Sequence, residues 1–292
     1  MTIRPTRSAL YMPGSNARAL EKAKTLDADV VILDLEDAVA PEQKAVARAQ
    51  VAAAVAAGGF GHRQVVIRIN ALDTPWGASD LAAAAGAGPD AVLLPKPNGA
   101  ADIERATDAM RRAQAPEETK LWAMVETPMA ILNIGELAGV SRHAGARLTC
   151  LVLGTNDLVK ETRAELDGAR VAALYWLSAS VTAARAYSLT VLDGVYNNFK
   201  DLDGLRQEST QGRMLGFDGK TLIHPDQIAT ANSVFAPRPE EVMIARKIIV
   251  AFEQPENRGK GVITLDGRMI ELLHAEMAQR TVAIADAIAR RG

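Results

Sequence analysis

The sequence predicts an α/β fold, a (β/α)8 TIM barrel with a C-terminal helical and hairpin extension, from three observations. Eight short apolar runs recur along the chain, and an Ala-rich amphipathic stretch follows each one. The runs begin 22 to 42 residues apart, which suits one strand, one helix and two short loops per unit. The length of 292 residues accommodates a single barrel and an addition to it.

The eight expected strands are rich in β-branched residues or leucine. They are SALYM from Ser8, VVILD from Val30, QVVIRI from Gln64, AVLLP from Ala91, KLWAMV from Lys120, LTCLVLG from Leu148, TVLDG from Thr190 and GKTLI from Gly219. The widest gap holds an extra segment between Asn156 and Asp167. An open doubly wound sheet would show two differently patterned halves and a dinucleotide fingerprint. The glycines of AAAGAGPD precede a strand, so we interpret them as the end of a helix.

A long tail follows the eighth unit. It contains a helical stretch (PEEVMIARKIIVAFE), a Gly-rich turn (NRGKG), a hairpin-like VITLDGRMI and a last helix that runs to Arg290. Polar and apolar residues alternate in helical register, so we expect the tail to dock on another surface. We therefore predict a catalytic barrel over residues 1–236 and an extension over residues 237–292 that acts as a lid or an inter-subunit element.

Composition excludes several classes of protein. The 33 basic and 35 acidic residues leave a net charge of −2, and only 4% of residues are aromatic, so no nucleic-acid partner is expected. The longest apolar tract, AQVAAAVAAGGFG, predicts a helix and its C-cap and is too short to span a membrane. The N-terminus has no secretory apolar region, and the single cysteine, Cys150, excludes an intrachain disulfide. We predict a cytoplasmic protein with no membrane partner.

Polar side chains follow the apolar runs, at the strand ends where a barrel of this type carries its chemistry. They are Ser15, Asn16, Asp34, Glu36, Asp37, Arg68, Asn70, Lys96, Glu126, Asp157, Asp193, Asn197 and His224.

Glu126 and Asp157 are the predicted metal ligands. They follow the fifth and sixth runs, and neighbouring parallel strands lie about 4.8 Å apart, so both carboxylates can reach a common point. Two anions at that separation raise one another's pKa unless a cation lies between them. Oxygen-only ligands without a histidine or cysteine cluster predict Mg²⁺. The alternative is that each acid only caps a helix, for which Thr127 and Asn156 are equally suitable.

Arg68 is the next candidate, because a guanidinium within QVVIRI needs an anionic partner to offset its desolvation. Glu36 or Asp37 on the neighbouring strand tip can be that partner, and so can a substrate carboxylate or a developing enolate oxygen. Period-two alternation points Asp34 and Glu36 to the same side. Any of the three acids can hold metal-bound water or only solvate a loop.

Two other polar residues favour structural roles. Lys96 lies between prolines in LPKP and nothing near it in sequence lowers its pKa, so charge pairing is preferred over a Schiff base. His224 lies in IHPDQI, a pattern typical of a strand end followed by a helix start, and the four histidines lack the spacing of a ligand set.

The ordered motifs resemble a known family. PGSN, VVILDLEDAV, VIRIN, LLPKP, VETP, GTNDL and GKTLIHPDQI are together similar to the citrate lyase β-subunit-like acyl-CoA lyases of the HpcH/HpaI aldolase superfamily, over roughly residues 5 to 290. The resemblance implies a Mg²⁺-dependent (β/α)8 enzyme that cleaves or forms a carbon–carbon bond in a 3-hydroxyacyl-CoA such as malyl-, citramalyl- or citryl-CoA.

The same resemblance implies residue roles. Glu126 and Asp157 would bind Mg²⁺ directly, Arg68 would orient the keto-acid and polarise the reacting oxygen, and Asp37 would support metal-bound water. Relatives carry an acid in a closing tail that enters a neighbouring subunit's site. Here GRMIEL places Glu271 at that position, and Asp266 is a second candidate. We also predict that Gly154, Thr155 and Asn156 bind substrate together with Arg68.

The expected partners are a CoA thioester, a short keto-acid and further copies of the chain in a homotrimer. Two alternatives to the lyase are an aldolase that forms a pyruvate enolate from free 2-keto-3-deoxy acids, and a citrate lyase β subunit that depends on an acyl-carrier protein.

Overall fold

The computed structural model describes residues 4–291. The chain divides into two compact units, one formed by Thr6–Phe235 and the other by residues 1–5 with residues 236–292.

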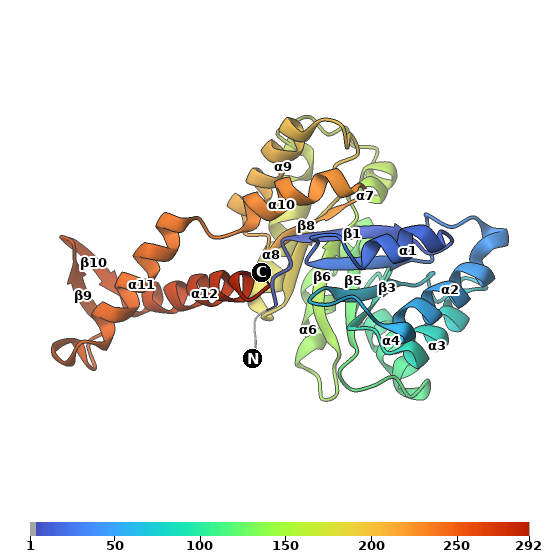
Figure 1. The fold of residues 1–292 in the computed structure, drawn as a ribbon, viewed down its shortest axis with the longest axis horizontal. Helices are drawn as coiled ribbons and strands as arrows, with labels where there is room; N and C mark the ends of the chain where they lie inside the picture. The colour runs from blue at the N-terminus through green and yellow to red at the C-terminus, as the bar shows by residue number, and fades with distance from the viewer. Residues whose placement is uncertain (1–3, 292) are drawn as a thin grey trace. The chain divides into compact units, whose positions relative to one another are not determined.

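The larger unit is a closed barrel of eight parallel strands in sequential order, so the predicted fold class is confirmed (Figure 1). The strands are β1 (Ser8–Pro13), β2 (Val30–Asp34), β3 (Gln64–Arg68), β4 (Ala91–Leu94), β5 (Lys120–Val125), β6 (Leu148–Leu153), β7 (Thr190–Asp193) and β8 (Gly219–Leu222). Each strand begins at the residue that the apolar runs predict.

Helices follow the strands around the barrel. They are α1 (Ala17–Ala23), α2 (Lys44–Ala57), α3 (Gly77–Ala87), α4 (Ala100–Arg112), α5 (Pro128–Leu132), α6 (Ile134–Gly139), α7 (Thr155–Thr162), α8 (Leu174–Ala186), α9 (Leu202–Leu215) and α10 (Ile228–Phe235). Short 3-10 turns add η1 (Pro41–Gln43), η2 (Val140–Arg142), η3 (Val171–Ala173) and η4 (Pro225–Gln227). The extra segment predicted after β6 holds most of α7, and α3 ends with Gly88 in the left-handed conformation that favours glycine.

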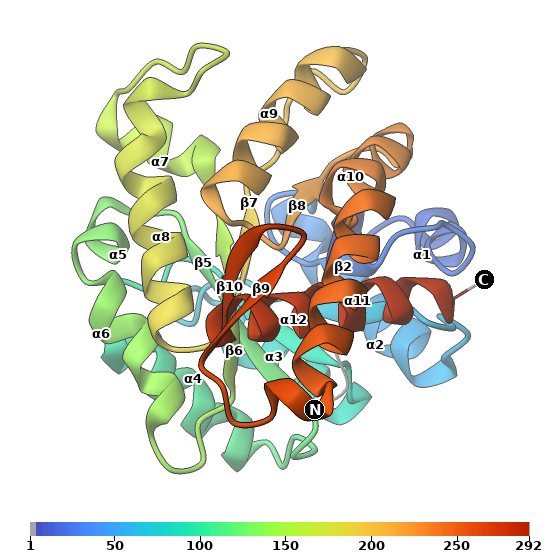
Figure 2. The same cartoon turned by 90° about the vertical axis from the view of Figure 1, so that its left-hand side faces the viewer.

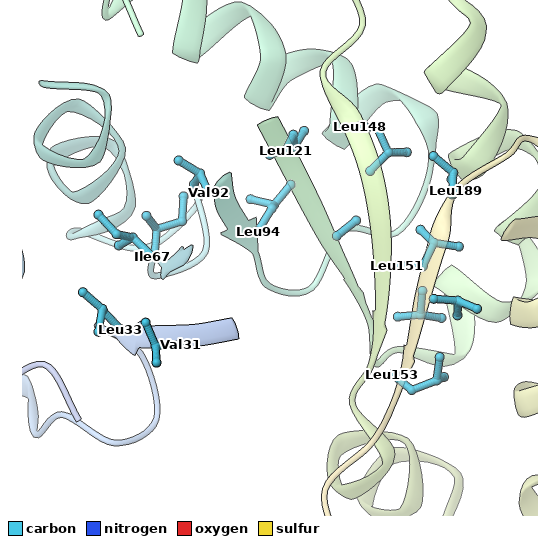
Figure 3. Close-up of a cluster of buried hydrophobic side chains, with 14 of the residues drawn as sticks. Val31, Leu33, Ile67, Val92, Leu94, Leu121, Leu148, Leu151, Leu153 and Leu189 are labelled. Atoms are coloured by element: carbon cyan, nitrogen blue, oxygen red, sulfur yellow. The ribbon is translucent and has the colours of Figure 1, made fainter. Parts of the chain in front are cut away.

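Alternation along the strands separates two apolar layers. Leu121, Ala123 and Val125 of β5 join a cluster that also includes buried helix residues, so they face the surrounding helices (Figure 3). Trp122 and Met124 join a second cluster built from strand residues, which fills the barrel interior. Cys150 of β6 is buried in this inner cluster, as its apolar surroundings predict.

The same alternation decides which polar residues reach the mouth of the barrel. Met124 faces inward, so Glu126 does too, and the register that pairs Val125 with Leu153 places Gly154 beside it. Ile32 and Val66 also face inward, which carries Asp34 and Arg68 to the interior at the ends of β2 and β3.

The smaller unit contains the predicted tail elements: α11 (Pro239–Glu253), η5 (Pro255–Asn257), β9 (Val262–Leu265), β10 (Arg268–Glu271) and α12 (Leu272–Ala289). The hairpin turns at Asp266 and Gly267, which both have positive φ and so form the two-residue turn that suits the twist of paired strands (Figure 2). In residues 4–291, no helix is both long and apolar enough to cross a bilayer.

Candidate active site

Glu126 is a buried carboxyl group at the barrel mouth whose charged form is unfavourable without a cation beside it. It is 1% exposed, and its Oε1 accepts a hydrogen bond of 2.8 Å from the backbone N–H of Lys96. Its Oε2 is buried without a hydrogen-bond partner in the described part of the chain. Burial and then the nearby carboxylates of Glu36 and Asp157 raise the pKa of Glu126 to about 8. A carboxylate held in this way is stabilised by any cation that reaches Oε2.

Gly154 makes room for that carboxylate. A Cβ at Gly154 would lie 2.4 Å from Cβ of Glu126 and 2.6 Å from its Oε2, closer than carbon and oxygen atoms can approach. The absence of a side chain at residue 154 therefore lets Glu126 point into the mouth of the barrel.

Asp157 lies in the first turn of α7 with its side chain 26% exposed. The residue at the N-cap of this helix is Gly154, so Asn156 does not cap it. Thr127 does cap α5, because its hydroxyl accepts a 3.0 Å hydrogen bond from the backbone N–H of Ala130. Neither acid is therefore the N-cap residue of its helix, but Asp157 lies in the first turn of α7, so the helix-start alternative still applies to Asp157.

The buried guanidinium of Arg68 contacts three carboxylates, those of Asp34, Glu36 and Asp37. Its Nε and Nη2 donate to the two oxygens of Asp34 at 2.7 and 2.6 Å. Its Nη1 lies 2.8 Å from Oε2 of Glu36 and 3.2 Å from Oδ2 of Asp37, and the guanidinium stands 4.7 Å from the ring centroid of Tyr11. Burial lowers the pKa of Arg68, but Asp34, Tyr11 and Glu36 together outweigh it and the net shift is upward. The two structural partners predicted for Arg68, Glu36 and Asp37, are present, and Asp34, which was not predicted as a partner, makes the shortest contacts.

Lys44 holds the acidic loop after β2 in place through hydrogen bonds to its backbone. Nζ of this buried lysine donates to the carbonyl oxygens of Leu35 and Glu36 at 2.9 and 2.7 Å. Asp34 accepts from the backbone N–H of Glu36 at 2.9 Å. Sequence analysis missed Lys44. The lysine lies among alanines at the start of a helix, and only the fold shows that its side chain turns toward the loop.

Lys96 connects the two halves of the acidic cluster. Its Nζ lies 3.3 Å from Oε1 of Glu36 and 3.7 Å from Oδ1 of Asp157, which confirms the predicted charge pairing. Burial lowers the pKa of Lys96, but the carboxylates of Glu36, Glu126 and Asp157 together raise it above its ordinary value. Lys96 is therefore an ammonium ion at neutral pH.

We call the charged residues at the barrel mouth the mouth cluster, and together they carry an excess of negative charge. It contains five carboxylates and two cations, which leaves three formal negative charges when all are ionised. Its members are Asp34, Glu36, Asp37, Glu126, Asp157, Arg68 and Lys96.

The donor set fits Mg²⁺. The described residues include no cluster of three or more His, Cys, Asp or Glu side chains arranged as a complete metal cage. Mg²⁺ binds through one or two carboxylates and keeps water or substrate oxygens in its other positions. The unpartnered Oε2 of Glu126, with Asp157 nearby, supplies ligands of that kind.

The predicted substrate-binding residues after β6 have contacts of their own. Thr155 is buried against Gly194, where a Cβ would lie 2.5 Å from its hydroxyl oxygen. Asn156 exchanges two side-chain hydrogen bonds with Asn197, of 3.1 and 2.8 Å, which ties the loops after β6 and β7 together.

Four further candidates belong to the smaller unit or have structural partners of their own. Glu271 ends β10 in the smaller unit, where its backbone N–H donates to Nδ1 of His274 at 3.0 Å. Asp266 occupies the hairpin turn. His224 caps η4 by accepting from the backbone N–H of Asp226 at 3.3 Å, in agreement with its predicted structural role. Asp193 leaves the barrel interior altogether and binds Arg170 and Lys220 behind the strands.

Comparison with known proteins identifies close relatives. The chain is 48% identical to a (3S)-malyl-CoA thioesterase of Cereibacter sphaeroides, over 98% of this chain and 96% of that protein. It is 35% identical to the citrate lyase subunit beta of Escherichia coli, over 92% of this chain and 89% of that one.

A solved structure shares the architecture. CitE from Mycobacterium tuberculosis, in complex with magnesium, acetoacetate and coenzyme A, matches with a TM-score of 0.74 and 29% identity, and the match covers 96% of this chain and 99% of that one. The family model for HpcH/HpaI aldolase/citrate lyase matches residues 7–225. This match covers nearly the whole barrel, and the chain therefore belongs to the HpcH/HpaI aldolase/citrate lyase family.

Proposed function

We propose that this chain is a Mg²⁺-dependent enzyme that acts on a malyl-CoA-type thioester. The observation that carries the proposal is the buried, unpartnered Oε2 of Glu126 within a cluster of excess negative charge. Such a cluster attracts a divalent cation, and through it an anionic oxygen substrate. The thioester comes from the relatives, since one is a (3S)-malyl-CoA thioesterase and a solved neighbour holds magnesium and coenzyme A.

Each polar residue of the site has a part in this proposal. Glu126 and Asp157 would hold Mg²⁺, which when bound neutralises and polarises substrate oxygens. Arg68 would orient the substrate carboxylate and stabilise negative charge that develops on the reacting oxygen. Asp37 would support metal-bound water, and Gly154, Thr155 and Asn156 would line the substrate position. Asp34 holds the guanidinium of Arg68 in a single orientation.

We propose thioester hydrolysis as the reaction, because the 48% identity extends over nearly the full length of both chains. Water adds to the thioester carbonyl carbon and the carbon–sulfur bond breaks. The products are malate and the free thiol of coenzyme A.

Carbon–carbon cleavage is the second candidate, and the family and the citrate lyase relatives favour it. In malyl-CoA the C3 hydroxyl would lose its proton and the C2–C3 bond would break. Glyoxylate would leave, and the enolate of acetyl-CoA would be protonated at carbon. The acid for that last step would come from the tail, and Glu271 is our first choice for it.

One assay separates these reactions. Purified protein is incubated with (3S)-malyl-CoA and Mg²⁺, and free thiol and glyoxylate are measured in parallel. Hydrolysis releases thiol without glyoxylate, whereas cleavage releases glyoxylate and leaves the sulfur acylated. Activity only on CoA-free 2-keto-3-deoxy acids would indicate the aldolase. Activity only on an acyl-carrier-protein thioester would indicate a citrate lyase β subunit. Product formation equal to that of the Glu126→Gln variant, with each substrate, would refute the proposal.

The tail supports a homo-oligomer, for which we propose a trimer. In the described part of the smaller unit, large apolar side chains stay more than half exposed, which is typical of a surface that another chain covers. They are Met243, Ile244, Val250, Met269, Leu272 and Met277.

Subunit mixing tests whether a tail acid serves a neighbouring barrel. In the carbon–carbon cleavage reaction, Glu126→Gln impairs the barrel and Glu271→Ala removes the proposed tail acid, so each variant alone would be inactive. A mixed oligomer would regain activity if the tail of one subunit completes the barrel of another. A mixture that exchanges subunits and stays inactive would contradict the proposal, as would a monomeric sedimentation profile for the unmodified protein.

A further inference from the structure

We propose that the ammonium group of Lys96 occupies, in the metal-free protein, the place between the carboxylates into which Mg²⁺ binds, and that it moves out when the metal arrives. This inference rests on the Mg²⁺ site of the proposed function and adds to it a lysine that competes with the metal.

The contacts of Lys96 reach both sides of the site. Its Nζ lies near Glu36, from the loop after β2, and near Asp157, from the first turn of α7 after β6. Its backbone N–H holds Oε1 of Glu126, after β5. One residue therefore contacts three carboxylates from three separate strand ends. An ammonium between like charges lowers the repulsion that would otherwise separate them.

The backbone and the side chain of Lys96 differ in how freely they can move. Lys96 has a φ of +54° between Pro95 and Pro97, a left-handed conformation that is unfavourable for a residue with a side chain. This conformation belongs to a rigid segment, and its N–H keeps Glu126 oriented. The side chain is 39% exposed on a flexible four-carbon stem, so the ammonium has a path to solvent.

Repulsion between Mg²⁺ and the ammonium group of Lys96 is the reason that the lysine side chain moves. A divalent cation bound by Glu126 and Asp157 would stand close to an ammonium that also contacts Asp157, and the two positive charges repel strongly at such separations. Mg²⁺ must therefore displace the ammonium. The loss of the two ion pairs of Lys96 then reduces the apparent affinity of the protein for the metal.

Mg²⁺ titration by isothermal calorimetry provides the first test. Lys96→Met keeps the length and apolar stem and removes the charge, so we expect it to bind Mg²⁺ roughly three- to tenfold more tightly than the unmodified protein. Lys96→Arg keeps the charge and should stay weaker than Lys96→Met. Lys22→Met, at an exposed position on α1, is the matched control and should leave the affinity within about twofold of the unmodified protein.

The results separate this inference from the proposed function. Absence of Mg²⁺ binding by the unmodified protein would refute the metal site itself and this inference with it. Binding by the unmodified protein with equal or weaker binding by Lys96→Met would leave the metal site standing and overturn the role of Lys96 as a competitor, because it would mean that the ammonium organises the site.

Lysine acetylation followed by mass spectrometry provides a second test that needs no variant. Saturating Mg²⁺ should increase the acetylation of Lys96 by at least about twofold, because the freed ammonium is more exposed, and should leave Lys22 unchanged. Unchanged or reduced acetylation of Lys96 in the presence of Mg²⁺ would contradict the proposal, and it would do so even if the Lys96→Met variant failed to fold.

Discussion

Two charged clusters in the barrel domain differ in how their charges are balanced. The mouth cluster has five carboxylates and two cations. The cluster behind β7 and β8, which we call the Asp193 cluster, has two of each. Nη1 of Arg170 binds both oxygens of Asp193 at 2.8 and 2.9 Å, and Nζ of Lys220 binds Asp193 at 3.1 Å and Glu208 at 2.7 Å.

The pKa shifts of the two clusters run in opposite directions. Burial favours protonation of Asp193, but Lys220 and Arg170 outweigh it and the pKa of Asp193 falls below its ordinary value. Burial and neighbouring acids act together on Glu126 and raise its pKa to about 8. A buried charge that is fully paired stabilises the fold in its present form, whereas an unpaired one becomes stable when a ligand supplies the missing charge. The comparison therefore indicates a structural role for the Asp193 cluster and a binding role for the mouth cluster.

The largest expected effect is on activity, from Glu126→Gln. The amide keeps the shape of the side chain and removes the negative charge, so turnover of (3S)-malyl-CoA should fall by about 10³-fold and Mg²⁺ affinity should fall with it. The free energy of unfolding should stay the same or rise, because the amide replaces a carboxyl group whose ionised form burial disfavours. Glu161→Gln, at an exposed position on α7, is the control. If neutral amides at Glu126 and Asp157 together left turnover untouched, the assignment of the mouth cluster would be wrong.

Asp193→Asn should have the opposite effects to Glu126→Gln, with a loss of stability and little change in turnover. It leaves Arg170 and Lys220 buried with one anion fewer, so we expect the free energy of unfolding in urea to fall by about 3 to 5 kcal/mol. Turnover per folded molecule should change little. Asp203→Asn, on the exposed start of α9, should change stability by less than about 0.5 kcal/mol. A large loss of turnover without a loss of stability would show that the Asp193 cluster is functional.

Gly154→Ala tests whether the position of the Glu126 carboxylate, as well as its charge, is needed for activity. The added Cβ would meet Glu126 at 2.4 Å, so the carboxylate must shift although no charge changes. Misplacement of about 1 Å at a reacting centre costs on the order of 10²-fold in rate. We expect that loss in kcat of the steady-state reaction, with Gly168→Ala, whose Cβ would meet open space, as the control. Unchanged kcat in Gly154→Ala would mean that the position of Glu126 does not matter.

Acidification should reveal the Asp193 cluster by its pH dependence. The pKa of Asp193 is lower in the folded protein than its ordinary value of 3.8, so its contribution to stability is present above about pH 4 and is lost as the pH falls through the folded pKa. The difference in unfolding free energy between the unmodified protein and Asp193→Asn should therefore shrink below pH 4. Urea melts at a series of pH values measure it, and a difference that stays constant would contradict the pairing.

Much of the fold follows from local patterns in the sequence. The β-branched runs predicted where all eight strands begin, and the 3.6-residue periodicity of PEEVMIARKIIVAFE predicted a helix that the structure places at Pro239–Glu253. The residue types at the strand ends also indicated the candidate site, because carboxylates and a guanidinium after buried runs need partners. The roles of Glu271 and of the residues after β6 remain predictions.

Asp34 and Asp193 show that the local sequence pattern does not predict which face of the barrel a strand-end residue lies on. Each is an aspartate at the end of an apolar run, VVILD and TVLD, and the two are alike in sequence. Strands of a parallel barrel are buried on both faces, so alternation of apolar and polar residues does not reveal which face is inside. The packing of β2 turns Asp34 toward Arg68 at the mouth, and that of β7 turns Asp193 outward to Lys220.

The sequence by itself thus determined the strands, the helices and the supply of charged side chains, because those depend on periodicity and residue chemistry. Tertiary structure alone decided which charges meet, because strand direction and the packing of helices around the barrel bring together residues far apart in the chain. Lys96 is the clearest case, since it lies 30 residues before Glu126, 60 after Glu36 and 61 before Asp157 in the sequence, yet contacts all three.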